Sequence, residues 1–192
     1  MAAEETLDDV LLETEDRMDR AVSFLADELG RLRTGKGSPA LVENVQVDYY
    51  GTQTRLRELA TISTPEPRLI VINPYDPSSV REIEKAILAA NLGVTPVADG
   101  KVIRIPIPEL SEERRRELNK VVRRIAEEQR VAVRNVRRDA NERIKALQRE
   151  GKITEDERDH ALEEIQKLTD DHIRRIDAMA REKEAEVMDM GG

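Results

Sequence analysis

Three stretches of the chain repeat an apolar residue every three or four positions, the pattern of helices that share a buried seam. They cover residues 7–32, 118–147 and 161–187. Ser111 and Thr154 precede acidic residues, as at a helix N-terminus, and Gly151 predicts a short turn between the last two helices. The pattern predicts an antiparallel three-helix bundle. The seam residues expected to be buried are Val122, Ile125, Val136, Leu147, Leu25, Ile165 and Ile176.

Residues 34–108 have a different pattern, with short β-branched runs separated by prolines. Alternating apolar and polar residues at 45–49 predict a half-buried strand, and Gly51 allows a turn after it. Ser79-Val-Arg-Glu82 reads as a capping signal for a helix that closes near residues 91–93. Further strands are expected at residues 59–62, 68–72 and 101–105. The fold class is therefore α+β, with a small domain inserted into the bundle.

The domain boundaries follow from this change of pattern. Residues 1–33 and 109–192 form the discontinuous bundle, and residues 34–108 form the inserted domain. Two crossings of the chain join the domains and are expected to form a hinge. The hinge residues are Gly35, Lys36, Gly37, Ser38, Pro106 and Pro108. The alternative is that both crossings are ordinary loops.

The composition narrows the classes of protein to consider. The 192 residues include no Cys, and aromatic residues make up only 2%. Disulfides and thiolate-ligated metals are excluded, and a typical enzyme pocket would contain more aromatic side chains. No apolar run approaches the ~20 residues of a membrane span, and the N-terminus is acidic, unlike a signal peptide. A cytoplasmic protein is expected.

No residues form a catalytic or metal-binding set. Residues 35–38 contain Gly-Lys-Gly-Ser, but they lack the first glycine and the preceding strand of a phosphate-binding loop. His160 and His172 lie on one predicted helix without further metal ligands, and His172 falls in the apolar seam, where it is expected at the packed edge. We therefore expect no enzyme activity, no cofactor and no metal.

Charge is distributed unevenly. The net charge is −8, yet residues 111–150 carry thirteen basic and eight acidic side chains. At about 100° per residue, one narrow sector of this helix holds the arginine row, defined as Arg116, Arg123, Arg130, Arg134 and Arg137. Arg138 and Lys120 lie at its edge, and acidic residues are expected on another face. Such a row suits the backbone phosphates of folded RNA. The alternative is pairing with acidic residues of the first and third helices.

Several segments resemble the ribosome recycling factor family. They are RTGKGSP at residues 33–39, VDYYGT at 47–52, RIPIP at 104–108 and VAVRNVRRDAN at 131–141. The similarity runs in order from about Arg17 to Met188. It implies an L-shaped molecule with a β/α/β inserted domain, and it assigns rRNA contacts to Arg115, Arg134 and Arg137.

The resemblance also implies the partners. Such a factor binds large-subunit rRNA and, with elongation factor G and the GTP that this partner binds, splits the ribosome after termination. A monomer that does not bind membranes is expected. A helical chaperone or adaptor that binds proteins through apolar grooves stays open as the alternative.

Overall fold

The computed structural model describes residues 4–189, which divide into two compact units. The bundle unit contains residues 4–32 and 113–188. The inserted unit contains residues 33–112 together with Asp189. Residues 1–3 and 190–192, which the sequence assigns to the ends of the bundle, lie outside the described residues.

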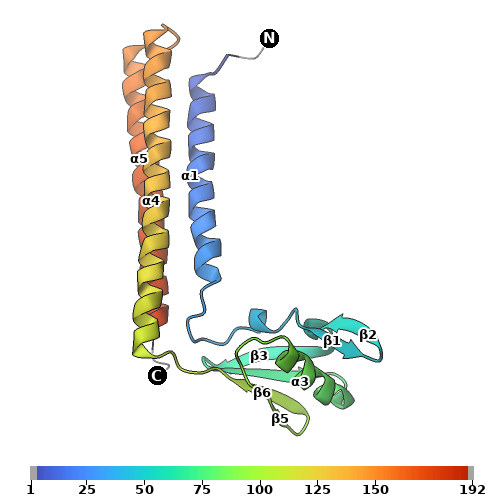
Figure 1. The fold of residues 1–192 in the computed structure, drawn as a ribbon. Helices are drawn as coiled ribbons and strands as arrows, with labels where there is room; N and C mark the ends of the chain where they lie inside the picture. The colour runs from blue at the N-terminus through green and yellow to red at the C-terminus, as the bar shows by residue number, and fades with distance from the viewer. Residues whose placement is uncertain (1–3, 190–192) are drawn as a thin grey trace. The chain divides into compact units, whose positions relative to one another are not determined.

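The bundle unit has the three predicted helices, and α4 runs antiparallel to the other two (Figure 1). Gly151 adopts a φ of +74° in the turn between the last two helices, and the Lys152 amide donates to the Leu147 carbonyl at 2.9 Å. Thr154 and Glu157 form the capping box that begins the last helix. The helices are α1 (Leu7–Gly30), α4 (Glu112–Arg149) and α5 (Glu155–Met188).

All seven seam residues named from the sequence are buried, which confirms the bundle pattern. They fall into two clusters rather than one. Leu147 and Ile165 pack near the turn between α4 and α5, and the other five pack in the other half of the bundle. Buried Thr14, Thr169 and His172 lie between the two clusters along α1 and α5.

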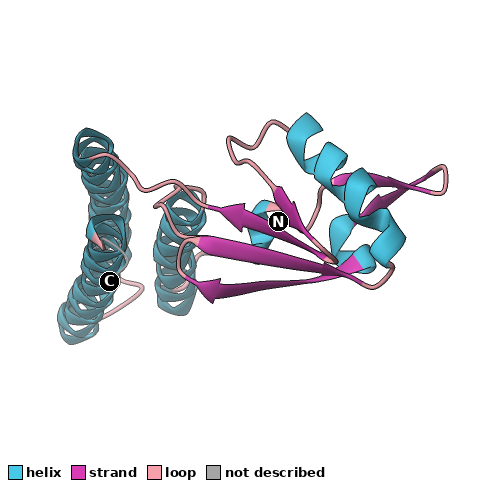
Figure 2. Ribbon diagram, turned by 90° about the horizontal axis from the view of Figure 1, so that it is seen from below, coloured by secondary structure: helices cyan, strands magenta, loops and turns pink. Residues whose placement is uncertain are grey.

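The inserted unit combines a two-stranded hairpin with a four-stranded antiparallel sheet in the order β3-β4-β6-β5. Figure 2 shows these strands in magenta and the helices in cyan. The elements are β1 (Gln46–Tyr49), β2 (Thr52–Arg55), α2 (Leu56–Leu59), β3 (Ala60–Glu66), β4 (Leu69–Pro74), α3 (Val80–Ala89), β5 (Val97–Asp99) and β6 (Val102–Pro106). Short 3₁₀ turns cover Pro39–Leu41 and Pro77–Ser79.

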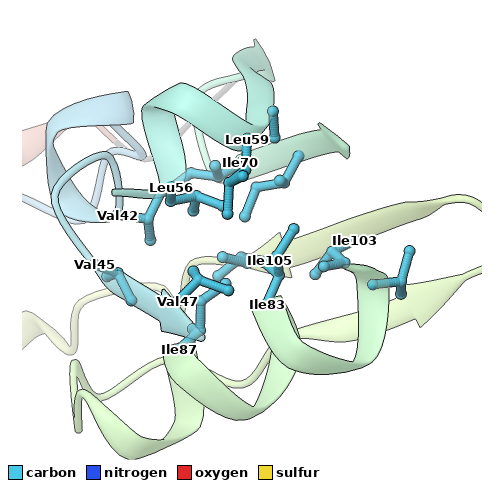
Figure 3. Close-up of a cluster of buried hydrophobic side chains, with 13 residues drawn as sticks. Val42, Val45, Val47, Leu56, Leu59, Ile70, Ile83, Ile87, Ile103 and Ile105 are labelled. Atoms are coloured by element: carbon cyan, nitrogen blue, oxygen red, sulfur yellow. The ribbon is translucent and has the colours of Figure 1, made fainter. Parts of the chain in front are cut away.

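The core of this unit lies between α3 and one face of the sheet (Figure 3). Alternate residues of the two central strands point to that face, and Ile70 pairs with Ile105 across the strands. Ile83 and Ile87 of α3 cover them, and all four side chains are fully buried. The fold is α+β, as predicted.

Several details of the inserted unit differ from the sequence expectation. Leu59, expected in a strand, ends the short helix α2. The strand that follows continues past Pro65, which is tolerated because β3 is an edge strand with an irregular register there. Ser79 does not cap α3 through a capping box, because its hydroxyl donates to the Asp76 carbonyl at 2.6 Å. The edge strand β5 was not predicted, because its three residues are exposed and do not alternate.

Within residues 4–189, no helix combines the length and the apolar character that crossing a lipid bilayer would require.

Candidate nucleic-acid interface

The arginine row lies along α4, whose 38 residues form one uninterrupted helix. The buried stripe of α4 packs against α1 and α5, so the row occupies a different sector of the helix surface. The exposed fraction of the side chain is 71% for Arg123, 39% for Arg134 and 22% for Arg130. The row is therefore accessible, but unevenly.

Acidic residues of α5 contact two members of the row. Arg123 Nε lies 2.9 Å from Glu184 Oε1, and Arg130 Nε lies 2.7 Å from Asp177 Oδ1. At these two positions the alternative reading of the sequence, pairing with the third helix, is correct.

Glu127 of α4 pairs with the row from the same helix. Its two carboxylate oxygens accept from Arg130 at 3.0 Å and from Arg134 at 3.3 Å. The hydrogen bonds from Arg130 and Arg134 lower the pKa of Glu127. The expectation that no acid accompanies the row on its own face is wrong here, because Glu127 lies seven residues before Arg134, which places it about 20° away on the same face of the helix.

The remaining residues of the predicted site differ in their surroundings. Within residues 4–189, no ion pair or hydrogen bond engages the half-buried side chain of Arg137. Arg138 is exposed and donates to Asn135 at 3.4 Å, and Arg116 is exposed near the start of α4. Arg115 is only 6% exposed, so it lies apart from the accessible row.

Most of the predicted hinge residues are fixed within the inserted unit. The Gly37 amide donates to the Pro67 carbonyl at 2.6 Å, and a β-carbon at Gly37 would lie 3.0 Å from Ile70. Gly35 has a φ of +81° and packs against Leu110. Ser38 caps the following 3₁₀ turn.

The second crossing is held in the same way. Pro106 is the last residue of β6, and the next residue, Ile107, donates its amide to the Arg68 carbonyl at 2.9 Å. Arg68 also pairs with Glu109 at 2.7 Å. Residues up to Leu110 therefore contact the inserted unit.

Two exposed tyrosines were not predicted as surface features. Tyr50 is 81% exposed with a φ of +50° at the turn of the β1–β2 hairpin, and Tyr75 is 70% exposed. The Tyr49 ring lies edge-on to Tyr50 at 4.6 Å, and its hydroxyl donates to Asp76 at 2.9 Å. Strand alternation alone does not reveal this exposure, because both exposed rings lie outside the strands.

The part of the chain that the structure describes holds no group of three or more His, Asp or Glu side chains that could bind a metal ion. His172, expected at the edge of the seam, is only 1% exposed. Its Nδ1 lies 2.6 Å from the Leu168 carbonyl oxygen, and its Nε2 lies 2.6 Å from Asp19 Oδ1. Both ring nitrogens are thus engaged in structural contacts.

Comparison with known proteins identifies the family. The family model for ribosome recycling factor matches residues 25–188. The ribosome-recycling factor of Geobacillus kaustophilus is 54% identical over 181 residues, covering 94% of this chain and 98% of the relative. That of Bacillus velezensis is 50% identical over 182 residues, covering 95% and 98%.

Two solved structures of the same family are similar to this chain in sequence and in fold. A solution structure of the ribosome recycling factor is 45% identical, with a TM-score of 0.72, and covers 97% of this chain and 99% of its own. In another, the T. thermophilus factor and E. coli elongation factor G are bound to the E. coli post-termination complex. It is 41% identical, with a TM-score of 0.62 and coverage of 96% and 100%. The chain therefore belongs to the ribosome recycling factor family, whose members are non-enzymatic translation factors.

Proposed function

We propose that this protein recycles ribosomes after termination by binding large-subunit rRNA through α4 and splitting the subunits with elongation factor G. The GTP is bound by that partner, and the protein acts as a cytoplasmic monomer without a cofactor or metal. The arginine row and Arg138 grip backbone phosphates, while the buried Arg115 supports the base of α4. The observation that carries the proposal is the accessible arginine row in a family whose T. thermophilus member is found on the post-termination complex.

The interface is tested by co-sedimentation with isolated large subunits over a series of salt concentrations. Arg134→Ala and Arg137→Ala should each weaken binding by about 1–3 kcal/mol, the scale for a charge-assisted hydrogen bond. Each should also reduce the slope of log affinity against log salt by roughly one. The matched control is Arg124→Ala, because Arg124 lies on the same helix and pairs with Glu128 at 3.1 Å, outside the row.

Normal binding by both row variants, or an equal loss for Arg124→Ala, would contradict this assignment. Circular dichroism should show the same helix content for all three variants. A general loss of structure is thereby separated from a loss of contact.

We further propose that the two units rotate relative to each other during splitting. Because residues 35–110 contact the inserted unit, the pivots are assigned to the short segments at 31–34 and 111–112. Inserting two glycines after Leu110 should leave large-subunit binding unchanged, since the row lies on the bundle. The insertion should slow subunit release with elongation factor G and GTP, because force is transmitted less directly. Unchanged release would leave both crossings as ordinary loops.

One observation favours the alternative function, a chaperone or adaptor. A groove of about 500 Å³ between α1 and α5 is lined by Leu11, Leu12 and Leu168, and Leu12 is 68% exposed. Charged residues line the rest of this groove: Glu15, Glu164, Lys167, Asp171 and Arg174. If the chain acts as a chaperone, Leu12→Ser should abolish protein binding and leave ribosome splitting intact. If the chain acts as a recycling factor, ribosome splitting should depend on Arg134 and Arg137 and should not depend on Leu12.

A further inference from the structure

We infer that Asp177, Glu184 and Glu127 act as internal counter-ions of the arginine row, occupying donor groups that RNA phosphates take over on binding. The arginines would form a subsite for phosphate, and the three carboxylates would compete with RNA for it and so limit the affinity for RNA. The inference rests on the proposed function and concerns the regulation of that same surface.

The subsite is a shallow pocket of about 270 Å³ between α4 and α5. Three arginines and two of the acids line it together with Ala180: Arg123, Arg130, Arg181, Asp177 and Glu184. The guanidinium groups therefore outnumber the carboxylates by one. Loss of both carboxylate contacts would leave the pocket lined by three arginines without these counter-ions.

The carboxylates and a phosphate would compete for the same atoms. Arg123 and Arg130 each direct Nε to a carboxylate oxygen, at 2.9 and 2.7 Å. A side-on bidentate contact with phosphate uses this edge of the guanidinium, through Nε and a neighbouring NH₂ group. Neither arginine can make that contact while its Nε is bound to α5.

Glu127 extends the same competition along α4. It accepts from Arg130 and Arg134 at once, whereas no described partner engages Arg137, one turn further along the helix. The row therefore offers Arg137 to a phosphate directly, whereas at Arg123, Arg130 and Arg134 a phosphate competes with a carboxylate.

These pairs contribute little to folding, because all three acids are partly exposed. The exposed fractions of the side chains are 41% for Asp177, 26% for Glu184 and 55% for Glu127. Exposed ion pairs are weak, and breaking one changes an equilibrium constant by up to about fivefold. A carboxylate that competes at this strength lowers RNA affinity by a similar factor without preventing binding.

The test uses the full-length protein and isolated large subunits at one fixed salt concentration. Asp177→Asn and Glu184→Gln should each raise the affinity by about two- to fivefold, and the double variant by about tenfold. The matched control is Asp171→Asn, which makes the same charge change on the same helix but lies at the α1–α5 groove. It should raise the affinity by less than about 1.5-fold, through net charge alone.

The salt slope provides a second signature. Removing a carboxylate should leave the slope unchanged, because the number of phosphates contacted stays the same, whereas Arg137→Ala should reduce it. Urea denaturation should show that each acid substitution lowers the folding equilibrium constant by no more than about fivefold.

The outcomes separate this inference from the proposed function. Weaker binding by Asp177→Asn and Glu184→Gln, or a gain no larger than that of Asp171→Asn, overturns the inference and makes the acids positioning residues for the arginines. Failure of the wild-type protein to bind large subunits, or normal binding by Arg137→Ala, instead overturns the proposed interface.

Discussion

The two units of the molecule build their interiors in different ways. The inserted unit has one cluster of thirteen buried apolar residues, closed by α3 on one side and the sheet on the other. The bundle has two clusters, with Thr14, Thr169 and His172 buried between them. The inserted unit is therefore closed around one core, whereas the long helices of the bundle carry charged side chains along their length.

The polar residues of the bundle are satisfied locally. The Thr14 hydroxyl donates to the Val10 carbonyl at 2.6 Å, and the Thr169 hydroxyl donates to the Ile165 carbonyl at 2.7 Å. Of these three buried residues, only His172 contacts a side chain of another helix, Asp19 of α1. A single buried polar residue can specify helix register in a coiled coil, so we expect this contact to help set the register of α1 against α5.

The difference between the two interiors can be tested by following the unfolding of each unit separately. All three tyrosines lie in the inserted unit and the chain contains no Trp, so tyrosine fluorescence reports on that unit alone. Circular dichroism at 222 nm reports mainly on the long bundle helices.

The largest effect is expected in the closed core. Ile105→Ala should destabilise the inserted unit by about 3–5 kcal/mol, because the fully enclosed side chain leaves a cavity that cannot collapse. Urea titration should move the tyrosine transition to lower denaturant and leave the helix transition in place. If both transitions move together, the units unfold as one and the comparison fails.

A somewhat smaller effect is expected in the seam. Ile176→Ala should cost the bundle about 2–4 kcal/mol, since a helix can shift partly into the vacated space. Here the transition followed at 222 nm should move and the tyrosine signal should stay. A loss below half a kcal/mol would show that the seam is wrongly assigned.

The polar contact between the helices comes next. Asp19→Ala should cost about 1–2 kcal/mol, because Nε2 of the buried His172 loses its partner. Asp16→Ala is the control, since Asp16 lies one turn away and pairs with the exposed Arg20 of its own helix. Equal stability of the two variants, measured at 222 nm, would argue against a register contact.

The smallest expected effects are changes in stability at low pH. The hydrogen bond from Arg143 lowers the pKa of Glu13 in the bundle, and hydrogen bonds from Ser78 lower the pKa of Asp76 in the inserted unit. A carboxyl group whose pKa falls on folding stabilises the folded state above its ordinary pKa, about 4, and loses this contribution as the pH falls further.

Each unit should therefore weaken slightly below about pH 4. Arg143→Gln should flatten this dependence in the 222 nm signal, and Ser78→Ala should flatten it in the tyrosine signal only. A change in the other signal would refute the assignment of each group to its unit.

The sequence predicted the bundle better than the inserted unit, for a physical reason. A helical seam repeats over many turns, so residues such as Val122 and Ile125 identify it together. The edge strand β5 has three exposed residues, and only pairing with β6 defines it. The position of Leu59 in a helix likewise depends on its surroundings.

The candidate interface shows the same limit. Helical geometry placed the arginine row correctly on one continuous helix, but the partners of Arg123 and Arg130 come from α5, more than forty residues away in sequence. The burial of Arg115 also depends on packing that no spacing rule reveals.

The order of the elements along the chain has a consequence for how the protein folds during synthesis. Nearly all of the inserted unit lies in one continuous segment, residues 33–112, so this segment can fold as soon as residue 112 has left the ribosome. α1 ends at Gly30, but its partner α5 begins only at Glu155. The first helix made therefore cannot pack against α5 until the last helix has emerged, and we expect the bundle to close last.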